Sequence, residues 1–112
     1  MPNKVYTTPI FETKFKRLSK KFASIGEELE ALEDDLKKNP KLGTQISGNI
    51  YKVRLASSDK GKGKSGGFRI ITYLIEEDHS STEIFLVTIY DKSEESTIKK
   101  PELVKLIKSI FQ

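Results

Sequence analysis

The first third of the chain has hydrophobic residues at helical spacing. A short strand is expected at residues 4–8, and Pro9 ends it. Five apolar residues then define one face of a helix: Phe11, Phe15, Leu18, Phe22 and Ile25. A second stripe follows Gly26 and consists of Leu29, Leu32 and Leu36. The Asn-Pro pair at 39–40 ends this segment, so the pattern predicts a strand followed by two amphipathic helices.

The polar positions of the two expected helices carry opposite charges. Lysine and arginine surround the first stripe, whereas glutamate and aspartate surround the second. An antiparallel helical hairpin would bury both stripes against a sheet while the outer charges compensate, although exposed pairs contribute only about 0–1 kcal/mol each. We interpret this charge pattern as solvated helix faces rather than as a binding site.

The second half of the chain changes to the two-residue period of strands. Tyr51, Val53 and Leu55 alternate with Lys52 and Arg54, which predicts one face in the core and one cationic face. Residues 68–75 and 84–90 are denser apolar runs, typical of central strands that are covered on both sides. Together these segments predict a three-stranded antiparallel meander.

A last helix is expected after the polar segment KSEEST. Pro101 suits its first turn, and four apolar residues give it one face: Leu103, Leu106, Ile107 and Ile110. The expected fold class is α+β, with an N-terminal strand, a helical hairpin, the three-stranded antiparallel meander and a C-terminal helix. With 112 residues, 36% of them hydrophobic, the chain has material for a single small domain over residues 1–112.

The composition excludes several kinds of chemistry. There is no cysteine, which rules out disulfides, thiolate nucleophiles and cysteine-ligated metals. The single histidine, His79, falls in an expected turn between strands, where we interpret it as solvated and idle. No apolar run is long enough to span a bilayer, and the start of the chain is too polar for a signal peptide. A cytoplasmic protein without a membrane partner is expected.

The positive charge is concentrated in one stretch. Residues 51–69 contain six cations and one acid, for a formal charge of +5, whereas the whole chain carries only +4. The rest of the protein is therefore slightly acidic. A local concentration of lysine and arginine among glycines is typical of a site for a polyanion such as RNA or DNA.

The loop KGKGKSGG lies inside this stretch and resembles two phosphate-binding motifs only superficially. G-x-G-x-x-G has meaning where it opens a helix, and here it opens a strand. The P-loop would require a glycine where the chain has Ser58, and it too would require a following helix. Two interpretations remain. The loop is either a flexible, soluble connection, or a segment in which Lys60, Lys62 and Lys64 bind RNA phosphates nonspecifically. Hairpin loops usually run to about 2–5 residues, so the length favours function.

Lysine, arginine and tyrosine can cleave RNA without histidine or cysteine. The 2′-hydroxyl of RNA can attack the adjacent phosphate, expel the 5′-oxygen and leave a 2′,3′-cyclic phosphate. The protein must orient that hydroxyl, stabilise charge on the phosphorane and move two protons. Arginine offers a planar fork to phosphate oxygens, lysine can act as base or acid, and tyrosine can stack on a base or donate a proton. This reaction needs no metal or other cofactor, and we expect none.

The order of these motifs resembles the RelE/ParE superfamily of type II toxins, in particular the RelE- and HigB-like mRNA interferases. The resemblance covers nearly the whole chain and is carried by the combination of IYKVRL, GGFRIITYLI and IFLVTIYDKSEE. It implies a ribosome-dependent endoribonuclease that cuts mRNA and thereby inhibits translation. It also implies a co-encoded antitoxin, for which a helix-turn-helix protein is one candidate, and the ribosome and mRNA as further partners.

The resemblance also implies roles for five residues. Lys52 and Arg54 match the basic pair of the family, and Arg69 matches its transition-state arginine. Tyr90 and Lys92 fall where the family places residues that orient or protonate the substrate. The long loop and Arg54, at a position where lysine is common, depart from the compact RelE pattern. Since arginine stays protonated, Lys52 is the expected base and Arg54 the expected electrostatic group.

Several alternatives remain open from the sequence. Tyr51 and Tyr73 fit core aromatics, Lys92 fits an ordinary surface lysine, and Arg69 could form a structural ion pair with Asp91. A ParE-like toxin that inhibits DNA gyrase would use the same fold without nuclease chemistry. An inactive RNA-binding relative is the third alternative.

Overall fold

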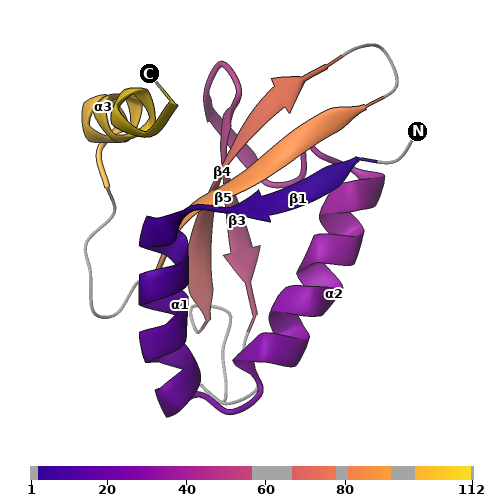
Figure 1. Cartoon of the computed structure of the whole chain (residues 1–112), viewed down its shortest axis with the longest axis vertical. Coiled ribbons are helices and arrows are strands. Elements are labelled where there is room, and N and C mark those ends of the chain that lie inside the picture. Colours follow the sequence, from indigo (N-terminus) through magenta and orange to yellow (C-terminus); the bar gives the residue numbers. More distant parts are fainter. Residues whose placement is uncertain (1–2, 57–66, 78–80, 92–97, 112) are drawn as a thin grey trace.

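In this computed structural model the described residues are 3–56, 67–77, 81–91 and 98–111. Figure 1 shows the helices and strands that these residues form, coloured in the order of the sequence. The elements are β1 (Lys4–Thr7), α1 (Pro9–Lys21), α2 (Ile25–Lys38), β2 (Thr44–Ser47), β3 (Ile50–Leu55), β4 (Phe68–Glu76), β5 (Thr82–Asp91) and α3 (Lys100–Phe111). This is the α+β arrangement that the sequence predicts, with one additional strand.

The strands form a five-stranded mixed sheet in the order β1-β5-β4-β3-β2. β1 pairs parallel to β5, and the other neighbours are antiparallel. The predicted meander is therefore confirmed as β3, β4 and β5. The prediction of only three strands after the helices is wrong, because β2 adds a fourth at the sheet edge.

β2 is joined to β3 by a two-residue turn. Ser47 and Ile50 are paired, and Gly48 has a φ of +52° at the first turn position, where primed hairpin turns favour glycine. The strand has only four residues, TQIS, with two exposed and two half-buried positions. Because the sequence TQIS contains one large apolar residue, it lacks the alternation that would have predicted a strand.

Thr8 connects the first strand to the first helix. Its hydroxyl accepts a hydrogen bond from the backbone N–H of Phe11 (3.1 Å) and donates one to the carbonyl of Val87 on β5 (2.8 Å). Thr8 thus caps α1, and Pro9 occupies the first helical position, where its missing N–H costs nothing. Pro9 ends the strand as predicted and also begins the helix.

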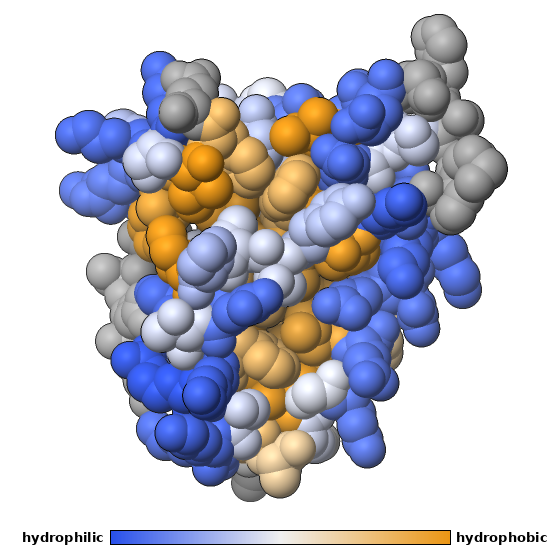
Figure 2. Space-filling model, viewed as in Figure 1, coloured by the Kyte–Doolittle hydropathy of each residue, from blue (hydrophilic) through white to orange (hydrophobic). Residues whose placement is uncertain are grey.

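The two helical stripes lie on one face of the sheet, with a boundary different from the predicted one. α1 ends at Lys21, residues 22–24 connect the helices, and Ile25 begins α2 instead of extending the first stripe. The main core joins Phe11, Leu18, Leu29 and Leu36 to the sheet residues of that face. Figure 2 shows hydrophilic side chains along the outer sides of both helices and apolar surface between them.

The opposite face of the sheet is covered in part by α3. Leu103 and Ile107 of this helix form a second apolar cluster with Ile71, Val87 and Tyr90 of the sheet. Most residues of β4 and β5 are buried on both faces, which explains why their sequences are so densely apolar. Among the described residues, no helix is long and apolar enough to cross a membrane.

Candidate functional site

Three of the predicted site residues form one row across the sheet. Arg54 on β3 lies directly opposite Arg69 on β4, and Arg69 lies directly opposite Tyr90 on β5. Tyr90 shares the apolar cluster of α3, so the row lies on the face that α3 covers in part. Side chains directly opposite each other on antiparallel strands have Cβ atoms about 4.5–5.5 Å apart.

Lys52 belongs to the next row on the same face. It lies two residues before Arg54 and opposite Ile71, which contacts the α3 cluster. Because successive strand residues alternate between faces, Lys52 and Arg54 point to the same side. The fold therefore brings Lys52, Arg54, Arg69 and Tyr90 together, although they come from three strands.

Exposure differs sharply within this group. Arg54 is exposed and Lys52 is half-buried. Arg69 is only 6% exposed, and Tyr90 only 1%. The site thus has a buried guanidinium beside two cations that reach solvent.

The guanidinium of Arg69 has little internal compensation. Within the part of the chain that the structure describes, its hydrogen bond is from Nη1 to the carbonyl oxygen of Phe68, at 3.5 Å, the weak end of the range. Asp91 follows Tyr90 and therefore points to the other face, away from Arg69. The ion pair with Asp91 does not form. A buried charge without a close counter-ion is costly, and an anion would offset that cost.

Gly67 brings the start of β4 against the end of β3, and thereby fixes the position of Arg69. Its φ is +99°, and a Cβ at this position would lie 2.5 Å from the carbonyl oxygen of Leu55. No other residue type fits that approach without displacing the backbone. The sequence signal for this glycine is the pair Gly66-Gly67 directly before an apolar strand, and it was not assigned a role at the site.

The two other tyrosines of the meander have different surroundings. Tyr51 is 7% exposed and belongs to the core beneath α1 and α2, as the core interpretation predicts. Tyr73 is half-buried on the α3 face, where its ring packs against Phe111 with centroids 4.9 Å apart. Tyr73 therefore lies on the same sheet face as Arg69.

Four predicted site residues lie outside the described residues: Lys60, Lys62, Lys64 and Lys92. His79 also lies outside them. Within the described ranges, no three His, Asp or Glu side chains gather closely enough to hold a metal ion. The observed part of the site consists of cations and a phenol, a set suited to binding a phosphate.

Comparison with known proteins identifies the family. Residues 5–110 match the family described as the RelE toxin of the RelE / RelB toxin-antitoxin system. The chain belongs to the RelE toxin family. The predicted resemblance is thereby confirmed, and a RelE toxin has a cognate RelB-type antitoxin as its partner.

A solved structure supports the fold of this RelE family member. The E. coli toxin RelE, in a mutant with two arginines replaced by alanine and in the free state, matches with a TM-score of 0.64. The match covers 99% of this chain and 100% of that chain, at 14% sequence identity. At this identity the likeness establishes a common fold, and the roles of individual residues need separate support.

Proposed function

We propose that this RelE family toxin is a ribosome-dependent endoribonuclease that cuts mRNA and so inhibits translation. The observation that carries the proposal is the buried guanidinium of Arg69, opposite Arg54 and close to Lys52, without an acidic partner among the described residues. A buried guanidinium without an acidic partner is unfavourable for the folded protein alone, but it is suited to a phosphodiester whose negative charge increases in the transition state.

The proposed reaction uses the 2′-hydroxyl of the RNA as nucleophile. The bond from O2′ to phosphorus forms while the bond from phosphorus to O5′ breaks, which leaves a 2′,3′-cyclic phosphate and a 5′-hydroxyl. Lys52 accepts the proton of the 2′-hydroxyl. Arg69 donates to the phosphorane oxygens, and Arg54 adds electrostatic stabilisation from the solvent side.

Tyr90 is assigned a positioning role. Its ring is almost completely buried directly opposite Arg69, in the cluster that includes Leu103 and Ile107 of α3. A phenol in this position restricts the side chain of Arg69 more readily than it reaches an RNA base. Lys92 remains the candidate for protonation of the leaving 5′-oxygen.

The lysines of the long loop are proposed to contribute affinity. Lys60, Lys62 and Lys64 would contact phosphates of mRNA or ribosomal RNA without reading the sequence. The cognate antitoxin would oppose this binding, and a helix-turn-helix protein is one candidate for it.

The proposal is tested by expression of the chain without its antitoxin. We expect translation to stop and mRNA to carry cuts inside codons, with a 2′,3′-cyclic phosphate and a 5′-hydroxyl at the new ends. Arg69→Ala should abolish both effects. Arg17→Ala, an exposed arginine on α1 at the other face of the sheet, is the matched control and should stay toxic.

Two outcomes would contradict the nuclease proposal. Growth arrest with DNA damage and intact mRNA would indicate a gyrase inhibitor of the ParE type. Harmless expression of the unmodified chain, at a level where the folded protein is detected, would indicate an inactive RNA-binding relative.

A further inference from the structure

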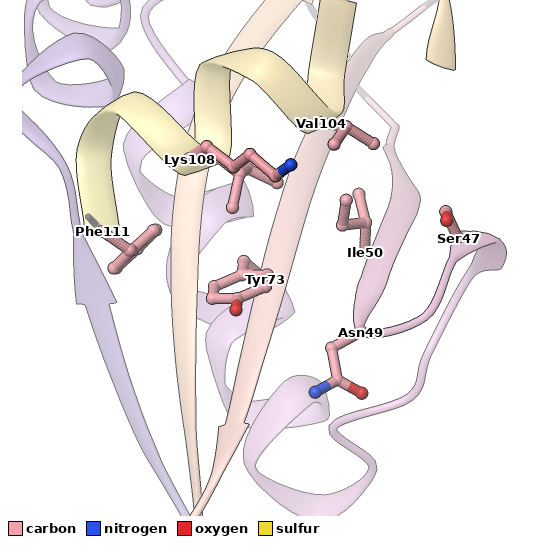
Figure 3. Close-up of a pocket in the computed structure, with 8 residues that line it drawn as sticks. Ser47, Asn49, Ile50, Tyr73, Val104, Lys108 and Phe111 are labelled. Carbon is pink, nitrogen blue, oxygen red and sulfur yellow. The ribbon is translucent and has the colours of Figure 1, made fainter. Parts of the chain in front are cut away.

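A cavity of about 270 Å³ lies between α3 and the turn that joins β2 to β3 (Figure 3). Its lining combines apolar and polar side chains from four separate elements and that turn. The residues that matter here are Ser47, Asn49, Ile50, Tyr73, Lys108 and Phe111. The proposed cleavage reaction uses none of them.

The apolar part of the cavity has a flat aromatic wall. The ring of Tyr73 packs on one side against Phe111, at 4.9 Å between centroids, and borders the cavity. Ile50, directly opposite Tyr73 on β3, forms the adjacent surface. With the centroids only 4.9 Å apart, no ring can enter between Tyr73 and Phe111, so a planar ligand would stack on the part of the Tyr73 ring that borders the cavity.

The polar part of the cavity has unused hydrogen-bonding capacity. The hydroxyl of Ser47, the amide of Asn49 and the ammonium of Lys108 make no hydrogen bond or ion pair with any residue that the structure describes. An asparagine amide both donates and accepts, as the edge of a nucleobase does, and an ammonium pairs with phosphate. Figure 3 shows these groups arranged around Tyr73 and Ile50.

The cavity lies on the sheet face that carries the cationic row. Tyr73 follows Arg69 by four residues on β4, and Ile50 precedes Arg54 by four residues on β3. At a rise of about 3.3 Å per residue, the separation along either strand is roughly 13 Å. A short stretch of single-stranded RNA can span this distance.

From these observations we infer that the cavity is a subsite for one nucleobase of single-stranded RNA. The base stacks on Tyr73 and pairs with the amide of Asn49, while Lys108 contacts a neighbouring phosphate. The inference rests on the proposed function, because it assumes that RNA is already bound at Arg54 and Arg69. An apolar side chain of a protein partner would fill the same volume, but it would leave the amide and the hydroxyl without partners.

The test measures binding of a short RNA that cannot be cut. Every 2′-hydroxyl is methylated, and one base at a time is replaced by an abasic residue. For the unmodified protein we expect one abasic position to weaken binding roughly tenfold or more, the usual effect of losing one stacked base. Tyr73→Leu should remove this dependence, whereas Tyr6→Leu, an aromatic residue at the sheet edge outside the cavity, should preserve it.

A second variant covers the case in which Tyr73→Leu does not fold. Asn49 is exposed, so Asn49→Ala should fold normally and should weaken binding only when the sensitive position carries its base. Equal losses at all abasic positions, or a position-specific loss that both variants retain, would overturn the subsite. If an apolar peptide that binds at Tyr73 competes with the RNA, and no abasic residue changes RNA binding, the subsite would be overturned in favour of a site for a protein partner.

Failure of the subsite and failure of the proposed function give different results. Methylated RNA reports binding without cleavage, so a base-dependent site can be found in a protein that never cuts mRNA. Conversely, mRNA cleavage that depends on Arg69 together with binding that ignores the abasic position would reject the subsite alone.

Discussion

Arg54 and Arg69 face each other directly across the β3–β4 pair. Like charges at directly opposed strand positions destabilise a sheet, and here one of the two guanidinium groups is almost completely buried. A phosphate bound between them would contact both guanidinium groups. Under the proposed function, the pair would link the stability of the free toxin to the binding of RNA.

Arg69→Met should separate stability from activity. We expect mRNA cleavage to fall by about 10²-fold or more, since a group that stabilises transition-state charge is lost. The free energy of unfolding should rise by about 1 kcal/mol or more, because an apolar chain of similar length replaces a buried charge. Thermal unfolding and primer extension on mRNA measure the two effects.

Arg17→Met on α1 is the control for this substitution, and it should change neither cleavage nor stability by a comparable amount. A large loss of stability in Arg69→Met, together with lost cleavage, would show instead that Arg69 holds the sheet together.

Tyr90→Phe distinguishes a positioning role from proton donation. If the ring acts by packing against Arg69, cleavage should fall less than tenfold and the pH profile should keep its shape. Loss of a general acid typically costs about 10²–10⁴-fold and removes one limb of that profile. Tyr90→Ala should impair both stability and cleavage, because it leaves a cavity in the cluster with Leu103 and Ile107.

The three loop lysines should govern the salt dependence of ribosome binding. Replacement of Lys60, Lys62 and Lys64 by alanine should weaken association and flatten its dependence on salt, since fewer counter-ions are released. Sedimentation with ribosomes over a range of salt concentrations measures this. The control is alanine replacement of Lys37, Lys38 and Lys41, which removes the same charge near the end of α2, outside the loop. If both triple variants bind like the unmodified protein at every salt concentration, the loop has no role in affinity.

Gly67→Ala should destabilise the sheet where the cationic row begins. The added Cβ would meet the carbonyl oxygen of Leu55 at 2.5 Å in a backbone conformation with a φ of +99°. Strain of this kind costs about 1–3 kcal/mol, and a shift of β4 would also displace Arg69 and reduce cleavage. Gly26→Ala is the matched control, because a Cβ there meets nothing within 4 Å and alanine favours the helix. Chemical denaturation of both variants provides the comparison.

The carboxyl group of Glu83 predicts a dependence of stability on pH. Its pKa is raised above the ordinary glutamate value, first by desolvation and then by the hydrogen bond with Glu77 and the negative charge of Glu77, with Lys4 acting in the opposite direction. A raised pKa means that the folded state binds the proton more tightly than the unfolded chain. The contribution to stability is therefore complete below the ordinary pKa and is lost as the pH rises through the raised pKa.

Glu77→Gln tests this contribution, because it removes the charge and keeps a hydrogen-bond acceptor for the protonated Glu83 carboxyl. Unfolding curves should show the variant more stable than the unmodified protein at neutral pH, with the difference disappearing as the solution is acidified. Glu76→Gln removes a neighbouring carboxylate that does not act on Glu83 and should not produce this difference. A difference that is independent of pH would contradict the assignment.

The sequence by itself determined the elements with strong periodicity and the place of the positive charge. The stripes of Leu18 and Leu36 predict helices, and the alternation around Lys52 and Arg54 predicts a strand with a cationic face, because each pattern is local and repeats several times. The motifs of β3, β4 and β5 also carried the family resemblance.

Only the tertiary structure decided which residues meet. The opposition of Arg54 and Arg69 depends on strand register, the burial of Arg69 depends on packing between segments distant along the chain, and the cavity beside Tyr73 depends on where α3 lies. The edge strand β2 is also a feature that only the tertiary structure decided, since four residues with little apolar character become a strand only by pairing with β3. Local periodicity cannot specify these features, because register and burial arise from contacts between residues far apart in the chain.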